Sequence, residues 1–134
     1  MKKIYWGYII LILLSSCGFA IKKKIVGNYY LIATDTGEQL GLSYCDPKDS
    51  NGCFGITEGT VYSAGHNENY IVAKQHPNDN RQIINYFILP IKSKRNINGN
   101  FGLIGPLNLV EFEIKRRQLN ITSIKFDVVY KELE

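Results

Sequence analysis

Three cysteines and two histidines are the side chains of this 134-residue sequence whose types and spacing could do chemistry. A cysteine can act as a nucleophile, form a disulfide or bind a metal, and a histidine can act as a base or as a metal ligand. Cys17 lies close to the start of the chain, whereas Cys45, Cys53, His66 and His76 lie in its middle. Their surroundings differ, so each group needs its own interpretation.

The start of the chain has the layout of an export signal. Two lysines are followed by an apolar stretch over residues 4–14 and by a pair of serines just before Cys17. A basic start, a short apolar core and small residues at the cleavage point are typical of a secretory signal peptide. The sequence therefore predicts a signal peptide over residues 1–16. The alternative is an uncleaved membrane anchor over residues 4–21, which has about the minimum length for a spanning helix.

The residues Leu14-Ser15-Ser16-Cys17 resemble the lipobox of bacterial lipoproteins. In that family the cysteine sulfur carries diacylglycerol, the signal is cut off before it, and the new amine is commonly acylated. The resemblance implies a mature protein that begins at an acylated Cys17. More than one acyl chain would hold such a protein firmly on a membrane. Because Gly18 is not an aspartate, the resemblance also implies that the protein is located in the outer membrane of a Gram-negative host. In a Gram-positive host it implies the outer face of the plasma membrane.

Cys45 and Cys53 are the thiols that remain once Cys17 is assigned to lipid, and an exported protein meets an oxidising compartment. The residues between them are almost all turn formers, so we expect the two cysteines to face each other across a loop between strands. The sequence therefore predicts a Cys45–Cys53 disulfide. Zinc fits less well because the spacing is not that of a zinc knuckle. A calcium loop also fits less well, because its first ligand position would be Pro47.

The basic residues are concentrated in clusters at 22–24, 92–95 and 115–117, within a formal net charge of +4. Aromatic residues that could stack on bases are not interleaved with them, and an exported protein meets little nucleic acid. Nucleic acid is therefore not an expected partner. The simplest interpretation of the clusters is a solvated surface. A second interpretation places residues 22–24 beside anionic headgroups or lipopolysaccharide phosphate.

Much of the sequence has the period of β-strands, with short alternating or apolar segments separated by turn residues. The predicted strands lie at residues 27–33, 40–45, 54–57, 60–64, 70–75 and 83–89. No helical period separates these segments, so the pattern predicts an antiparallel meander rather than alternating strands and helices. A hydrophobic content of 45% is ordinary for a small globular domain.

Residues 109–119 fit a helix better than a strand. Asn108 and Glu111 have the spacing of a capping box, in which each side chain accepts a hydrogen bond from the other residue's backbone N–H. The side chains expected on one buried face are Leu109, Phe112 and Leu119. A strand remains the alternative, because apolar and polar residues alternate at the start of the segment.

Residues 121–130 alternate again and predict a last strand. The fold class is therefore mainly β (α+β), an antiparallel sheet or meander of about six to seven short strands with one C-terminal helix packed on it. We expect the signal peptide to be followed by a lipidated N-terminus and tether over residues 17–26. A single β-rich domain is expected over residues 27–134.

The predicted domain also resembles small lipoproteins of Bacteroidota and some Firmicutes that have no established activity. The matching segments are Asn28-Tyr29-Tyr30-Leu31, Tyr70-Ile71-Val72-Ala73-Lys74-Gln75, Tyr86-Phe87-Ile88, Gly105-Pro106-Leu107 and the spaced residues Phe112, Arg116 and Leu119. The resemblance covers most of the chain after the lipobox. It implies an envelope location and a type of domain, and it supplies no catalytic residue.

The sequence contains none of the common catalytic motifs: no nucleophile elbow, no zinc-protease helix motif, no phosphate loop and no paired-histidine metal motif. His66 and His76 fall in separate predicted loops, and Glu111 and Glu113 would lie on different faces of a helix. We therefore expect no enzyme activity, no metal or cofactor and no small-molecule substrate. The expected function is a membrane-anchored, non-enzymatic lipoprotein that binds an envelope protein or a cell-wall component. The alternative is an inhibitor or immunity-type protein acting on a secreted enzyme or toxin.

Overall fold

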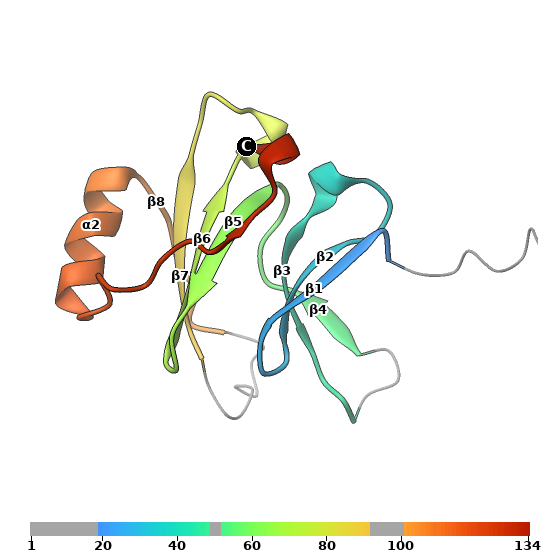
Figure 1. Cartoon of the computed structure of the whole chain (residues 1–134), viewed down its shortest axis with the longest axis horizontal. Coiled ribbons are helices and arrows are strands. Elements are labelled where there is room, and N and C mark those ends of the chain that lie inside the picture. The colour runs from blue at the N-terminus through green and yellow to red at the C-terminus, as the bar shows by residue number, and fades with distance from the viewer. Residues whose placement is uncertain (1–18, 49–51, 92–100) are drawn as a thin grey trace, which may run out of the picture.

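The computed structural model describes residues 19–48, 52–91 and 101–134, whose strands form two antiparallel sheets (Figure 1). The first sheet has the strand order β1-β2-β3-β4 and the second has the order β8-β7-β6-β5-β9. The strands are β1 (Ile21–Val26), β2 (Tyr29–Ala33), β3 (Gly41–Cys45), β4 (Cys53–Gly55), β5 (Val61–His66), β6 (Tyr70–Gln75), β7 (Asn85–Pro90), β8 (Ile104–Leu107) and β9 (Val128–Val129). The helical elements are α2 (Leu109–Gln118) and the short 3-10 helices η2 (Gly37–Gln39), η3 (Pro77–Asp79) and η4 (Lys131–Leu133).

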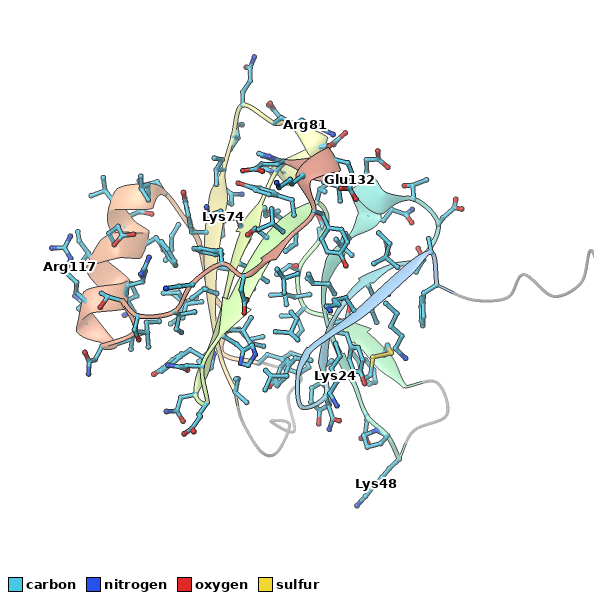
Figure 2. All side chains as sticks on the ribbon, in the orientation of Figure 1. Lys24, Lys48, Lys74, Arg81, Arg117 and Glu132 are labelled. Atoms are coloured by element: carbon cyan, nitrogen blue, oxygen red, sulfur yellow. A yellow bond between two sulfur atoms is a disulfide. The ribbon has the colours of Figure 1, made fainter. Side chains whose placement is uncertain are left out.

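The two sheets pack face to face on an apolar cluster that we call the main core (Figure 2). Its fully buried members include Leu31, Leu40, Leu42, Val61, Ile71 and Leu89, which come from strands of both sheets and, for Leu40, from the residue just before β3. Leu133 of η4 belongs to the same cluster, so the C-terminal turn also packs on it. Burying an aliphatic side chain of this size stabilises a fold by about 1.5–3 kcal/mol.

A smaller cluster, the helix core, lies between the other face of the second sheet and α2 (Figure 1). Its buried members are Val72, Tyr86, Ile88, Phe112, Ile121 and Ile124. Successive side chains of a strand point to opposite faces of the sheet. On β6, Ile71 and Ala73 therefore lie in the main core while Val72 lies in the helix core. The second sheet is thus the middle layer of the molecule, with apolar side chains on both faces.

The predicted helix and its capping box are confirmed. Asn108 accepts a hydrogen bond from the backbone N–H of Glu111 (2.9 Å), and the Glu111 carboxylate accepts one from the backbone N–H of Asn108 (3.0 Å). Phe112 is 1% exposed and its ring stacks on Tyr86, with the ring centroids 4.6 Å apart. The alternative of a strand at residues 109–114 was wrong, because the capping bonds and the buried ring fix a helix here.

Leu109 corrects one detail of the helix prediction, since it is 54% exposed. Residues of an α-helix follow one another at about 100°, so Leu109 lies about 60° around the axis from Phe112. Leu119 lies about 20° from Phe112 and is packed against the helix core. The buried face is therefore narrower than the sequence pattern indicated.

The strand predicted over residues 121–130 was wrong for most of its length. Its described strand pairing is confined to β9, in which Val128 and Val129 pair with β5. Ile121 and Ile124 are instead buried in the helix core, on a turn that follows α2. Before β9, the apolar residues of this segment therefore cover one face of the second sheet and do not add a strand to it.

Gly65 explains how this last segment reaches the sheet. The sequence placed Gly65 in a turn, but it lies inside β5 and is buried. A Cβ atom at this position would overlap the carbonyl oxygen of Lys125. The missing side chain thus allows the backbone on its way to β9 to pass directly over β5.

Strand β1 was not predicted, because its residues were assigned to the tether over 17–26. It pairs with β2 from Ile21 to Val26, which extends the folded region back from residue 27 to Ile21. Its three lysines are compatible with an edge strand, because charged side chains there oppose pairing with another chain. Ile21, Ile25 and Val26 pack against the main core and hold the strand in place.

Strand β8 was also missed, because Gly105 and Pro106 indicate a turn. Proline is tolerated in β8 because that strand lies at the edge of the second sheet, where one side needs no backbone donor. The described residues therefore form nine strands in two sheets, not six to seven in one. The mainly β, α+β class is confirmed. In this part of the chain, no helix combines the length and the apolar character needed to cross a membrane.

Candidate functional site

The predicted lipid site, Cys17, lies outside the described residues, as do the predicted signal peptide and the basic cluster at 92–95. The first described residue is Phe19, whose side chain is 45% exposed. The part of the molecule next to the predicted lipid is therefore the start of β1. The lipid itself stays a prediction.

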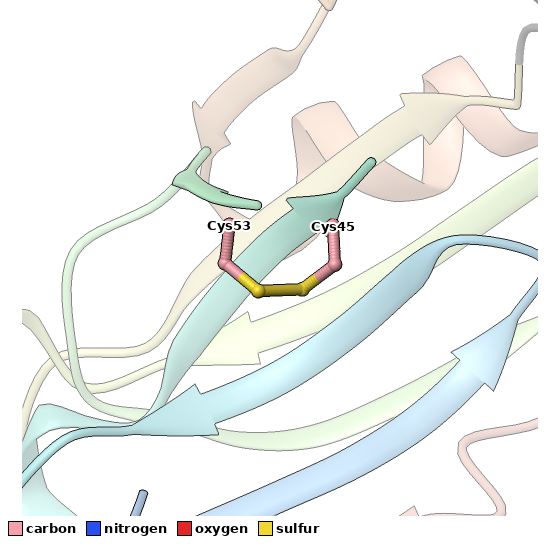
Figure 3. The surroundings of a disulfide bond; sticks show 2 residues. All are labelled: Cys45 and Cys53. Atoms are coloured by element: carbon pink, nitrogen blue, oxygen red, sulfur yellow. A yellow bond between two sulfur atoms is a disulfide. The ribbon is translucent and has the colours of Figure 1, made fainter. Parts of the chain in front are cut away.

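Cys45 and Cys53 form a disulfide that joins the end of β3 to the start of β4 (Figure 3). They are register partners with Cα atoms 4.0 Å apart, and the backbone N–H of Asp46 donates to the carbonyl of Gly52 at 2.7 Å. The predicted disulfide is confirmed. In the chain-entropy model, closing so short a loop contributes about 2.5 kcal/mol to stability.

The outer face of the first sheet is the face turned away from the main core. Strand register and alternation place on it the side chains or Cα hydrogens of Lys22, Lys24, Tyr30, Ile32, Gly41, Ser43 and Gly55. The small residues of β3 and β4 leave a hollow of about 230 Å³ in this face. Phe19 and Ile32 line one part of the hollow, and Cys53 and Thr57 line another.

Positive charge and aromatic rings meet at the β1 side of this outer face. The Lys22 ammonium nitrogen lies 5.1 Å from the ring centroid of Tyr30 and 5.6 Å from that of Phe19. Such a separation is within the range of cation–π attraction. The outer face therefore presents lysine, exposed aromatic surface and a shallow hollow beside the start of the described chain.

A second hollow, of about 490 Å³, lies where η2, η3 and the end of the β4–β5 connection meet. Its lining residues are Glu38, Gln39, Glu58, Gly59, Asn78 and Asp79. The Asp79 carboxylate lies 3.8 Å from the Arg81 guanidinium. No group of three or more potential metal ligands was found in the ranges that the structure describes. This second hollow is lined by acidic side chains, whereas the outer face carries lysines.

His76 lies between β6 and η3, in a connection as the sequence indicated, and is 2% exposed. Its backbone continues the pairing of β5 and β6 through two hydrogen bonds with Thr60 (2.8 and 3.0 Å). Its Nδ1 lies 2.8 Å from the carbonyl oxygen of Ile83, and its ring stacks on Tyr62 with centroids 4.2 Å apart. Its Nε2 is buried, and no hydrogen-bond partner for it lies among the described residues.

Among the described residues, His76 makes none of the contacts that activate a general base. A general base needs a ring nitrogen within reach of a hydroxyl, a water or a substrate proton, and a partner that orients the ring. Nδ1 of His76 is used by a backbone carbonyl, and Nε2 meets no hydroxyl or carboxylate in the described ranges. His66 is exposed, at the end of β5, with its Nδ1 3.2 Å from the carbonyl oxygen of Asn67. The two histidines therefore contact different backbone carbonyls, and neither of these hydrogen bonds links them to each other.

The tyrosine hydroxyls next to these groups are held in their neutral form. Burial, with smaller contributions from Tyr86 and Glu134, raises the pKa of Tyr62 to about 12. Burial also raises the pKa of Tyr86 and that of Tyr130. These hydroxyls therefore stay neutral to a higher pH than the hydroxyl of an exposed tyrosine.

The sequence could not have indicated the two hollows, because each is built from residues of distant strands and connections. Gln39 lines both hollows, and its side-chain oxygen accepts hydrogen bonds from the Thr34 hydroxyl and the Asp35 backbone N–H (2.8 and 2.9 Å). The same oxygen accepts a hydrogen bond from the backbone N–H of Thr36 (3.3 Å), the N-cap residue of η2, and these bonds together fix the connection between β2 and β3. Gln39 thus holds the β2–β3 connection in place, and no sequence motif predicted this role.

The profile of one protein family matches residues 26–130, a segment that spans β2 to β9 and includes α2. The family is described as a protein of unknown function, DUF3997. Searches of the curated proteins and of the solved structures gave no match. Since the profile covers far more than half of the sequence, the chain belongs to the DUF3997 family of proteins of unknown function.

Proposed function

We propose that this protein is an envelope lipoprotein anchored through Cys17, and that its β domain binds an envelope protein or a cell-wall component without catalysing a reaction. The observation that carries the proposal is the location of the domain's start. Only Gly18, Phe19 and Ala20 separate Cys17 from β1, and β1 begins on the side of the molecule away from α2 (Figure 1). An anchor at Cys17 would therefore leave α2 facing away from the membrane.

The disulfide supports the export step of this proposal. Stable disulfides form in oxidising compartments outside the bacterial cytoplasm and are rare inside it. Cys45 and Cys53 are register partners in a hairpin, so they are placed to form this bond as soon as the first sheet folds. A protein with both cysteines reduced would lack this covalent bond between β3 and β4.

Exposed apolar side chains on α2 support binding as the role of the domain. Val110 is 68% exposed and Ile114 is 49% exposed, on the helix face opposite Phe112. Arg117 lies on the same exposed side, at the end of the molecule away from β1 (Figure 2). Exposed apolar side chains that lie together on one face can mark an interaction site, and arginine is enriched at protein-binding surfaces.

A pull-down from solubilised envelope, with the full-length protein as bait, tests the proposal. We expect an outer-membrane or cell-wall component to be retained and to be lost when Val110→Asp and Ile114→Asp are combined. The matched control combines Ile83→Asp and Ile84→Asp, because these isoleucines are also exposed (47% and 42%) but lie before β7. Retention that is identical for both double variants would contradict binding through α2. Capture of a secreted hydrolase or toxin would favour the inhibitor or immunity-type alternative.

A further inference from the structure

We infer that the outer face of the first sheet is a membrane-contact surface, on which Phe19, Lys22 and Lys24 lie against the headgroups of an anionic bilayer. The inference rests on the proposed lipid at Cys17. It goes further because it states which face of the domain lies on the membrane and what lipid chemistry that face prefers.

The length of chain after Cys17 restricts the choice of face. A residue spans at most about 3.6 Å of extended chain, so the Cα atom of Phe19 lies within about 7 Å of that of Cys17 along any path. A sulfur that carries acyl chains is held at the bilayer interface. The half-exposed ring of Phe19 is therefore confined to the depth of the headgroups. Aromatic side chains are favoured at this depth, since one part meets apolar chains and another meets water.

The lysines next to Phe19 point to the same side of the sheet. Lys22 pairs with Ile32 and Lys24 pairs with Tyr30, so both lysines share the outer face with the hollow. Their ammonium groups are exposed, and that of Lys22 lies over two aromatic rings. A face that combines exposed lysines with aromatic rings matches a layer of phosphate headgroups over apolar chains.

The distribution of acidic groups agrees with this choice. The side chains that line the hollow of the outer face include no carboxylate. The acidic residues Glu38, Glu58 and Asp79 line the other hollow instead, where η2 and η3 meet. An anionic surface would therefore attract the outer face and repel the neighbouring end. This difference orients the domain.

Intrinsic tryptophan fluorescence can read this orientation, because the only tryptophan of the sequence is Trp6, in the predicted signal peptide. In a Trp6→Phe background, Phe19→Trp puts a single reporter at the outer face. Val110→Trp puts the matched reporter on the exposed side of α2, and α2 lies at the other end of the molecule (Figure 1). The acylated protein, expressed from the whole sequence, is reconstituted in phosphatidylglycerol vesicles that contain brominated lipid, which quenches only nearby indole rings. Intact mass and flotation with the vesicles report the anchor in the same samples.

We expect the indole of the Phe19→Trp variant to be quenched several-fold more than that of the Val110→Trp variant, with its emission shifted to the blue. Adding Lys22→Glu and Lys24→Glu should lower the quenching of the Phe19→Trp reporter, whereas adding Lys115→Glu and Arg117→Glu on α2 should leave it unchanged. Replacing phosphatidylglycerol by phosphatidylcholine should lower the quenching of the Phe19→Trp reporter, as the two substitutions on β1 do.

An acylated protein that floats with the vesicles but shows equal, weak quenching of both reporters would overturn the inference and leave the anchor standing. A protein without an acyl group on Cys17 would overturn the anchor and the inference together. Strong quenching of the Phe19→Trp reporter that responds neither to the lysine substitutions nor to lipid charge would overturn the assignment of the lysines to headgroups.

Discussion

Phe112 in the helix core and Phe19 on the outer face are two phenylalanines in opposite surroundings. The Phe112 ring is 1% exposed and lies 4.6 Å from Tyr86 and 6.0 Å from Phe126, measured between centroids. The Phe19 ring is 45% exposed and lies under the ammonium group of Lys22. Burial of the first ring stabilises the fold, whereas the second leaves apolar surface available for contact. The two ends of the molecule thus use the same side chain for different purposes.

The basic clusters at the two ends differ in the same way, although their sequences look alike. Arg116 of α2 lies 5.2 Å above the Phe112 ring, bonds the Glu113 carboxylate at 3.1 Å and donates to the carbonyl oxygen of Thr122 at 2.5 Å. Lys22 lies over rings at an exposed edge strand. The cluster at 115–117 therefore contributes one residue, Arg116, to the packing of the fold, whereas the three lysines at 22–24 are exposed.

The largest effect expected from this comparison is at Phe112. Phe112→Ala should lower the free energy of unfolding by about 3–5 kcal/mol, because a buried ring is removed and a cavity remains. Phe19→Ala should change it by less than about 0.5 kcal/mol, since the ring is half exposed. Urea unfolding followed by circular dichroism measures both. Equal losses at the two positions would mean that the outer face is as tightly packed as the helix core.

Loss of the disulfide should have the next largest effect. Combining Cys45→Ala with Cys53→Ala should cost about 2.5 kcal/mol of unfolding free energy, since the unfolded chain gains the freedom of an open loop. Reducing the wild-type protein should give the same shift, and the double variant should not respond to reductant. A reduced protein of unchanged stability would show that the disulfide does not stabilise the first sheet.

The two arginines of the third basic cluster sharpen the comparison further. Arg116→Ala should destabilise the protein by about 1.5 kcal/mol, because it removes a charged hydrogen bond and the cover over Phe112. Arg117 is exposed, so Arg117→Ala should cost less than about 0.5 kcal/mol. Thermal unfolding of the two variants side by side is sufficient, and a reversed order would contradict the assignment of Arg116 to the fold.

The smallest measurable effect is expected at the helix cap. Asn108→Ala should cost about 1 kcal/mol, since the Glu111 backbone N–H loses its acceptor. Asn108→Ser keeps an acceptor at this position and serves as the control. If the serine variant lost as much stability as the alanine variant, the capping bond would not be the cause.

Local signals in the sequence were sufficient for α2, for the disulfide and for most strands. The capping box of Asn108 and Glu111 and the turn residues between Cys45 and Cys53 specify their own geometry within a few residues. The strand at residues 70–75 likewise follows from local sequence, because a short apolar run between turn residues is typical of a buried strand.

The remaining features depend on residues that are distant in sequence. The lysines of β1 resemble a solvated cluster until β2 pairs with them, and Pro106 indicates a turn until β8 is seen to be an edge strand. Ile124 alternates as in a strand but is buried under α2 because Gly65 lets the chain cross β5. The two hollows and the burial of His76 likewise depend on the packing of separate elements.

Both the proposed function and the assignment of the outer face depend on the lipid at Cys17, which the intact mass of protein extracted from membranes tests directly. We predict a chain that begins at Cys17 and carries the added mass of diacylglycerol on its sulfur, with or without a further acyl chain on its amine. A Cys17→Ser variant should lack this mass and leave the membrane fraction. A chain that retains residues 1–16 and a free Cys17 thiol would contradict the account.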